Sequence, residues 1–432
     1  MELKQSISKN RLLRSKYPDM PKKFMESEIQ LFETIEALPS SLEKLPPSYP
    51  DLLIGLLTHE NEDIATSIVK YLLTSPELPD SLTSSILVQT LLRPCEELRI
   101  LALSLLDRLP TSSLTITAST VSILIDLSCA SETSPEIKAA SSDYLFTLLT
   151  SSSSSISVDL DPILKSLSTY RKKDPTSEDI KEFISNIFSC LCTLLNHPDN
   201  RTSFRRLEGM ELMIRLLKAR NFTSSLALRV LRFALPENEE ESESSQRFIS
   251  VGGLKTVFSL FMGHHIRKQV KRYDADETEM MENVLCIVVS LCSTLIRDDD
   301  DMPLRRLKKK FQERDCEKVL RSCSLFVELD RKMRQDKEEE EEEELDAELY
   351  SLWRCSLLIL WIGKWDLLDR ELRSKGLSLA TVCDVAEECL SCESDNSKLR
   401  GPWIEYLKSS RRWIDVKKGG EMLPPPPRQV SE

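Results

Sequence analysis

The chain has 432 residues, of which 41% are apolar and 30% charged, and its formal net charge is −12. This acidic balance argues against sequence-independent binding to nucleic-acid phosphates. Only 10 residues are glycine, and Gly55 alone precedes Gly209, whereas all-β proteins and nucleotide-binding α/β domains need glycine in turns and phosphate loops. The composition therefore predicts an all-α protein built from amphipathic helices.

Residues 1–50 are predicted to form an N-terminal segment with a capping helix. Residues 1–23 are polar and basic, and Pro21 precedes an amphipathic helix expected over residues 23–38. Its apolar stripe is expected to consist of Phe24, Ile29, Phe32 and Ile35. Such a helix would cover the exposed end of a stack of repeats, which needs a polar outer face.

Residues 51–302 are predicted to form armadillo-like repeats. In the first repeat, apolar residues at 53–57 and 64–73 form two helix faces, and the polar residues 58–63 turn the chain between them. A serine run at 151–155 indicates a loop. Further apolar helices are expected over residues 86–92, 98–106, 121–127, 144–149, 160–167 and 177–195.

The helix that begins at Gly209 has the same apolar pattern as the one that begins at Gly253. The offset is 44 residues, within the roughly 40–47 residues of armadillo and HEAT units. One such unit cannot bury its own apolar face, so neighbouring copies must share a core. The sequence therefore predicts an armadillo/HEAT-like α-solenoid, an architecture that offers a binding surface rather than an active site.

Residues 303–416 are predicted to form a C-terminal helical extension, because longer helical patterns replace the repeats. Helices are expected over residues 304–311, 317–333 and 345–372. Residues 417–432 contain Gly419-Gly420 and Pro424–Pro427, which predicts a disordered, proline-rich tail.

Several blocks of this sequence resemble the beta-catenin-like protein 1 family of armadillo-repeat spliceosome components. They occur in the family's order and span roughly residues 11–370. The blocks are Tyr17–Asp19 with Lys23–Glu28, Leu56–Asp63, Tyr170–Ser177, Gly253–Met262 and Phe311–Val319.

The resemblance implies a non-enzymatic scaffold in pre-mRNA splicing. It implies nuclear localisation, association with the NineTeen complex, and binding to the Myb-domain splicing factor of that complex through a basic segment. The family's long N-terminal extension with basic import clusters has no counterpart here, so the sequence shows no strong import signal of its own and leaves the route of nuclear import open. No cofactor, nucleic-acid contact or membrane contact is expected, and the sequence leaves homodimerisation open.

Three acidic tracts fall between predicted helical units, where the corresponding loops of a solenoid would align. One hypothesis is an acidic rim that attracts a basic partner peptide. The alternative is a set of solvated charge runs, neutralised locally by residues such as Arg305 and Lys332. The candidate rim residues are Glu237, Glu239, Glu240, Glu241, Asp298, Asp299, Asp300, Asp301, Glu338, Glu339, Glu340 and Glu341.

Two other functional classes are alternatives to the scaffold. A nuclear-import adaptor binds basic peptides with a ladder of Trp and Asn side chains from successive repeats. Here all five Trp residues lie beyond the repeats, from Trp353 onward. In the first repeat, Leu73-Thr74 stands where such a repeat ends in Asn-Leu. A cytoskeletal or adhesion-linked armadillo protein is the structural alternative. The sequence contains no Walker, dinucleotide-binding, HExxH or GxSxG motif, and the isolated pair Cys389-x-x-Cys392 does not make a four-ligand zinc site.

The remaining features predict an intracellular protein. No secretory signal precedes the first helix, and the most apolar run, residues 357–362, is too short to span a bilayer. The 12 Cys residues are scattered. Those in apolar stretches, such as Cys190, Cys286, Cys292 and Cys355, are expected to be reduced and buried.

Overall fold

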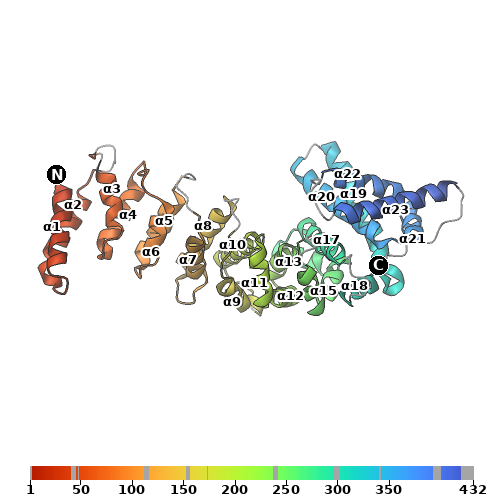
Figure 1. Ribbon diagram of the computed structural model, residues 1–432, viewed down its shortest axis with the longest axis horizontal. Helices are drawn as coiled ribbons and strands as arrows, with labels where there is room; N and C mark the ends of the chain where they lie inside the picture. Colours follow the sequence, from red (N-terminus) through yellow and green to blue (C-terminus); the bar gives the residue numbers. More distant parts are fainter. Residues whose placement is uncertain are drawn as a thin grey trace. The chain divides into compact units, whose positions relative to one another are not determined.

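The computed structural model divides the chain into two compact units (Figure 1). Unit 1 comprises Met1–Thr169 and Pro175–Asn200, and unit 2 comprises Tyr170–Asp174 and Arg201–Glu432. The structure describes residues 2–39, 45–46, 48–110, 116–151, 156–172, 174–236, 242–295, 302–339, 342–392 and 400–419, with the backbone alone for 336–339, 342–347, 400 and 418–419. No strand occurs in these ranges.

Unit 1 consists of antiparallel helix pairs, and the second helices of successive pairs, α2, α4, α6, α8 and α10, pack on one another in that order. This arrangement buries the apolar face of each pair against its neighbours, as a solenoid requires. The helices are α1 (Glu2–Lys16), α2 (Met25–Glu36), α3 (Tyr49–Leu56), α4 (Glu62–Thr74), α5 (Ser84–Thr90), α6 (Glu96–Asp107), α7 (Ala118–Cys129), α8 (Pro135–Thr150), α9 (Asp161–Ser168) and α10 (Glu178–Leu194).

The first repeat confirms the predicted helix faces. Leu53 and Leu57 on one side and Ile64 and Ile68 on the other are essentially inaccessible to solvent. The turn between them ends at Asn61, whose side chain accepts a hydrogen bond of 2.9 Å from the Asp63 N–H and caps α4.

The predicted stripe of the capping helix was partly wrong. Phe24 and Ile35 are buried as expected, but Ile29 is 53% exposed and Leu31, outside the predicted stripe, is fully buried. The buried face of α2 is therefore rotated away from Ile29. It packs against α1 and α4.

Helix α1 lies where the sequence predicts only a polar segment. It packs on α2 through side-chain hydrogen bonds rather than an apolar stripe, which is why hydrophobic periodicity does not reveal it. The Nδ2 of Asn10 donates to Ser27 Oγ over 3.0 Å, and both residues are buried. The Ser6 and Thr34 hydroxyls lie 3.3 Å apart, one helical turn along the interface.

Unit 2 contains the two helices that begin with a glycine, α12 and α15. Helix α12 packs on α13 and α15 packs on α17, and within this unit α13, α17 and α20 pack on one another in that order. The helices are α11 (Pro198–Arg206), α12 (Gly209–Ala219), α13 (Thr223–Ala234), α14 (Ser242–Ser250), α15 (Gly253–Phe261), α16 (Ile266–Tyr273), α17 (Glu277–Thr294), α18 (Met302–Gln312), α19 (Glu317–Glu339), α20 (Glu342–Ile362), α21 (Trp365–Ser374), α22 (Leu379–Cys392) and α23 (Arg400–Gly419).

The two glycines are required by a close approach that occurs twice. A Cβ added at Gly209 would lie 2.4 Å from the ring of Phe204, and one added at Gly253 would lie 2.4 Å from the ring of Phe248. Both rings are fully buried. The 44-residue repeat therefore includes the phenylalanine as well as the glycine. In each copy the phenylalanine of a short helix, α11 or α14, packs against the glycine that begins the following helix, α12 or α15.

The C-terminal helices differ from the prediction at three points. The helix expected over 345–372 is two helices, α20 and α21, because Gly363 takes φ = 67° and breaks the helix. Most of the Glu338–Glu344 run lies in the ends of α19 and α20 rather than in a loop, in keeping with the high helix propensity of glutamate. Helix α23 continues to Gly419, past the predicted tail boundary at 417, and residues 420–432 lie outside the described residues.

The end of α23 is held by Lys417. Its ammonium lies 3.3 Å from the carboxylate of Asp366 on α21 and 4.2 Å from the ring centre of Trp413. Both contacts favour the helical conformation at the point where the sequence predicts disorder.

Candidate docking groove

The predicted acidic rim lies almost entirely outside the described residues. This holds for Glu237, Glu239, Glu240, Glu241, for Asp298, Asp299, Asp300, Asp301, and for Glu340 and Glu341, while Glu338 and Glu339 belong to α19 with only their backbone described. The rim stays a prediction. Glu243, just beyond the first tract, pairs at 3.0 Å with Arg205 of α11.

A different concave surface is formed within unit 1, between α2, α4 and α6. Its volume is about 620 Å³. We call it the α2–α4–α6 groove. Its lining residues are Met25, Glu28, Ile29, Phe32, Glu36, Asn61, Asp63, Ile64, Thr66, Ser67, Lys70 and Glu97.

The α2 wall of the groove is apolar. Met25, Ile29 and Phe32 recur at helical spacing and share one face of α2 with Glu36. Met25 is 52% and Ile29 53% exposed. Helix α2 thus has two apolar faces, one buried against its neighbours and one open to solvent, and an open apolar face next to a concavity is typical of a binding surface.

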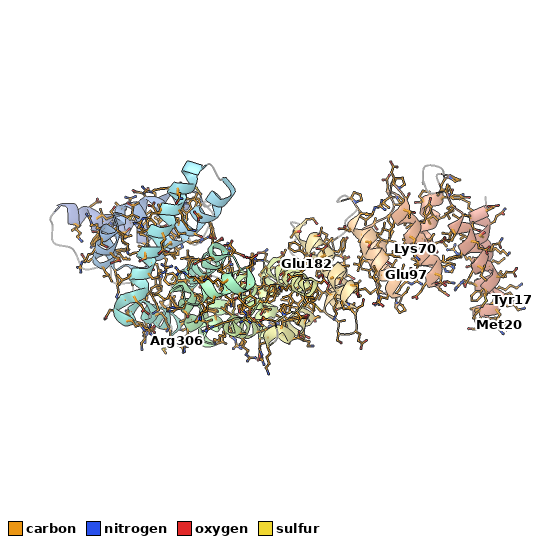
Figure 2. The ribbon with its side chains drawn as sticks, turned by 180° about the vertical axis from the view of Figure 1, so that it is seen from behind. Tyr17, Met20, Lys70, Glu97, Glu182 and Arg306 are labelled. Carbon is orange, nitrogen blue, oxygen red and sulfur yellow. The ribbon has the colours of Figure 1, made fainter. Side chains whose placement is uncertain are left out.

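All three helices contribute acidic side chains to the groove. Glu36, Asp63 and Glu97 supply carboxylates, and Lys70 is the one ammonium among the lining residues. Figure 2 shows Lys70 of α4 beside Glu97 of α6, and the two side chains form an ion pair of 2.7 Å. Hydrogen bonding to Glu97 raises the pKa of Lys70, and the charge of Glu36 adds to this rise. The carboxylates therefore outweigh the single cation.

A polar network fixes the end of the groove nearest α1. The Nε of Arg14 donates to Glu28 Oε1 over 2.7 Å, and the Nδ2 of Asn61 donates to Glu28 Oε2 over 3.0 Å. Glu28 thus joins α1, α2 and the cap of α4. Two cationic or amide donors satisfy its carboxylate, so its charge contributes less to the groove than those of Glu36 and Glu97.

His59 completes this network from the turn of the first repeat. Its Nε2 lies 3.0 Å from Asn10 Oδ1, and its Nδ1 accepts from the Asn61 N–H at 3.0 Å. An accepting Nδ1 makes Nε2 the donor in the neutral ring. Burial, followed by the positive charge of Arg14, lowers the pKa of His59 below its ordinary value. The histidine is accordingly a neutral structural link between the capping helices and the repeats.

The turn Tyr170–Asp174 makes a comparable link within unit 2. Asp174 accepts from the Phe222 N–H at 3.0 Å and from the Tyr273 hydroxyl at 2.8 Å, while Asn221 donates to the Tyr170 carbonyl at 3.0 Å. The turn lies between α9 and α10 in the sequence but ties the start of α13 to the end of α16. Its role is structural.

The side chains that could bind a metal ion do not cluster in the described part of the chain. Among the residues with described side chains, no three His, Cys, Asp or Glu side chains gather in a geometry that could hold a metal ion. Cys389 is buried, whereas Cys392 is exposed. The cysteines predicted to be buried in apolar helices are buried and are not joined in disulfides, which confirms that prediction; they are Cys190, Cys286, Cys292 and Cys355.

Stacked helix pairs, a repeated Phe–Gly contact and a solvent-facing groove define an armadillo-type α-solenoid with an N-terminal cap and a C-terminal helical extension. The chain belongs to the catenin-beta-like, armadillo-motif-containing nuclear family, whose model matches residues 1–153 and 123–354. The fold class and the resemblance predicted from the sequence are both confirmed.

Individual relatives agree with this assignment. Beta-catenin-like protein 1 of Homo sapiens is 28% identical over 358 residues, which are 73% of this chain and 62% of that protein. The Rattus norvegicus protein of the same name matches to the same extent. The Beta-catenin-like protein 1 homolog of Schizosaccharomyces pombe is 27% identical over 369 residues, or 76% of this chain and 63% of that protein. The chain thus spans under two thirds of these relatives' length.

Within the part of the chain that the structure describes, no helix has both the length and the apolar character needed to cross a membrane.

Proposed function

We propose that this protein is a non-enzymatic scaffold of the spliceosome that holds a basic segment of a splicing factor in the α2–α4–α6 groove. The observation that carries the proposal is the combination, in one concavity of a helical-repeat protein, of an open apolar wall with carboxylates that outnumber the single lysine. The proposed setting is the nucleus, in association with the NineTeen complex, and the proposed partner is its Myb-domain splicing factor.

The chemistry of the groove selects the partner segment. Lysine or arginine side chains would meet Glu36 and Glu97, whose charges steer a basic segment toward the surface. An apolar side chain on the same segment would cover Met25 and Ile29. Burying the exposed half of each side chain would contribute about 1 kcal/mol to the binding free energy. A short amphipathic and basic segment satisfies both demands, whereas a purely charged one leaves the apolar wall exposed.

Fluorescence anisotropy with a labelled Lys/Arg-rich peptide that carries one central leucine tests this proposal. The double variant E36K/E97K should weaken binding by about tenfold or more at low salt, because it reverses the charge of the groove. The loss should shrink as salt is added. Ile29→Ser should weaken binding of this peptide, but not of a peptide in which serine replaces the leucine.

The matched control is E132K/E182K. Both glutamates are exposed in unit 1 and outside the groove, and Figure 2 places Glu182 on α10, away from the Lys70–Glu97 pair. This variant changes the net charge equally and should bind nearly as the unmodified protein does. Equal weakening by the two double variants would assign the effect to overall charge and refute the groove as the binding site.

A further inference from the structure

Unit 2 contains a second concavity with the opposite charge. It lies between α12, α15 and α16, with α13 and α17 beneath it, and its volume is about 320 Å³. Three of its lining residues are cationic: Lys218 and Arg220 at the end of α12, and Lys255 in the first turn of α15. No carboxylate lines this pocket, although the chain as a whole carries a net charge of −12.

The three cations of this basic pocket are available to a ligand. Lys218, Arg220 and Lys255 are exposed and make no ion pair with the described residues. Helix α16 adds further positive charge nearby with its Arg-Lys-Gln-Val-Lys-Arg sequence. Burial, together with the charges of Arg220, His264 and Lys268, lowers the pKa of His265 at the pocket wall. Cations that line one pocket, with no carboxylate among its lining residues, favour an anion.

The interior of the pocket offers apolar and hydrogen-bonding contacts that a small free anion would not use. Leu260 and Met280 form an apolar floor. Gln269, only 4% exposed, also lines the pocket, and its Oε1 has no hydrogen-bond partner among the described residues. A buried amide oxygen without a donor is unfavourable, and a backbone N–H of a bound chain is a suitable donor.

We propose that this basic pocket binds an acidic peptide segment of a partner protein, with an apolar side chain on the floor and flanking carboxylates against Lys218, Arg220 and Lys255. Gln269 would accept a hydrogen bond from the segment's backbone. The pocket lining includes no aromatic side chain except His265 on which a nucleic-acid base could stack. Its apolar floor would make no favourable contact with a charged phosphate. A protein segment therefore fits better than RNA.

This inference is independent of the α2–α4–α6 groove, because the two sites lie in different units and select opposite charges. Together they would let one chain hold a basic and an acidic segment at the same time. A scaffold with two sites of opposite sign can bring two partners together without confusing them, since each site repels the other's ligand.

The direct test is fluorescence anisotropy of the full chain with a labelled peptide of Glu and Asp residues around one leucine. We expect saturable binding that weakens about tenfold or more in K218E/K255E. We also expect Ser259→Trp, which fills the pocket from α15, to abolish binding. Replacing the leucine of the peptide by serine should weaken binding to the unmodified protein, because the floor would be left uncovered.

The control K22E/K23E changes the net charge equally at two exposed lysines of unit 1 and should leave binding unchanged. No saturable binding of the acidic peptide, equal affinity for the serine peptide, or equal loss in the control variant would overturn the proposal. Tighter binding of a labelled oligouridylate than of the peptide, lost in K218E/K255E, would overturn it in favour of RNA. The basic peptide used for the groove should bind K218E/K255E normally, so either proposal can fail alone.

Discussion

Replacing the repeat glycines by alanine should destabilise the protein, which is the reverse of the usual effect of this substitution within helices. A Cβ at Gly253 would lie 2.4 Å from the Phe248 ring, whereas ordinary contacts of a Cβ begin near 3.4 Å. The ring would have to move by roughly 1 Å within a packed core that leaves no empty space. Overpacking of this kind costs about 1–3 kcal/mol, and Gly209→Ala should behave alike against Phe204.

Gly55→Ala is the matched control. Gly55 lies within α3, and nothing lies within 4 Å of a Cβ added there. This substitution should stabilise the protein by about 0.5–1 kcal/mol, because alanine loses less backbone entropy in a helix. The sign of the effect therefore separates the two kinds of glycine in one experiment.

Urea unfolding followed by circular dichroism measures the overall change, and hydrogen exchange of α14 and α15 locates it. Phe248→Leu replaces the ring with a smaller side chain and should restore part of the stability that Gly253→Ala loses. The double variant should therefore be more stable than the sum of the two single effects predicts. If Gly253→Ala proved as stable as Gly55→Ala, or if the two changes were additive, the Phe–Gly contact would not be the basis of the repeat.

Three other predictions concern single contacts. Asp174→Ala should destabilise unit 2 by about 2 kcal/mol, because the Phe222 N–H and the Tyr273 hydroxyl lose their acceptor; unchanged hydrogen exchange at the start of α13 would contradict this. The pKa of His59 is lowered in the native state, so its contribution to stability is complete above about pH 6.5 and is lost as the pH falls toward the native pKa. His59→Gln should therefore reduce the change in the urea midpoint between about pH 7.5 and about pH 5.5. An unchanged pH dependence of the midpoint would refute the role of His59 in stability. Arg229→Ala should cost only about 0.5–1 kcal/mol, because its bidentate pair with Glu279 across α13 and α17 is about one third exposed; a larger loss in thermal unfolding would show that the pair is more buried than the structure indicates.

The stack could be predicted from the sequence wherever apolar residues repeat at helical spacing. Ile64 and Ile68 follow this rule, and so do the helices after Gly209 and Gly253. Helix α1 could not be found in this way, because buried polar side chains such as Asn10 hold it to α2. Hydrophobic periodicity shows which residues are apolar. It does not show which polar residues form hydrogen bonds in the folded protein.

The groove was missed for a related reason. Ile29 and Ile35 were assigned to one stripe, yet they lie on different faces of α2, one open and one buried. Only the position of the neighbouring helices separates a binding face from a packing face. The basic pocket likewise depends on α12, α15 and α16 meeting in space, since Lys218 and Lys255 are far apart in the sequence.

Photo-crosslinking from the groove would identify directly the segment that binds there. A benzoylphenylalanine at Ile29 would report what covers the apolar wall in nuclear extract, and the same group at Leu92, which is 57% exposed outside the groove, would serve as the control. We expect a crosslink from Ile29, and not from Leu92, to a Lys/Arg-rich segment of a splicing factor. Identical products from both positions, or a product from Ile29 that maps to an acidic or uncharged segment, would contradict it.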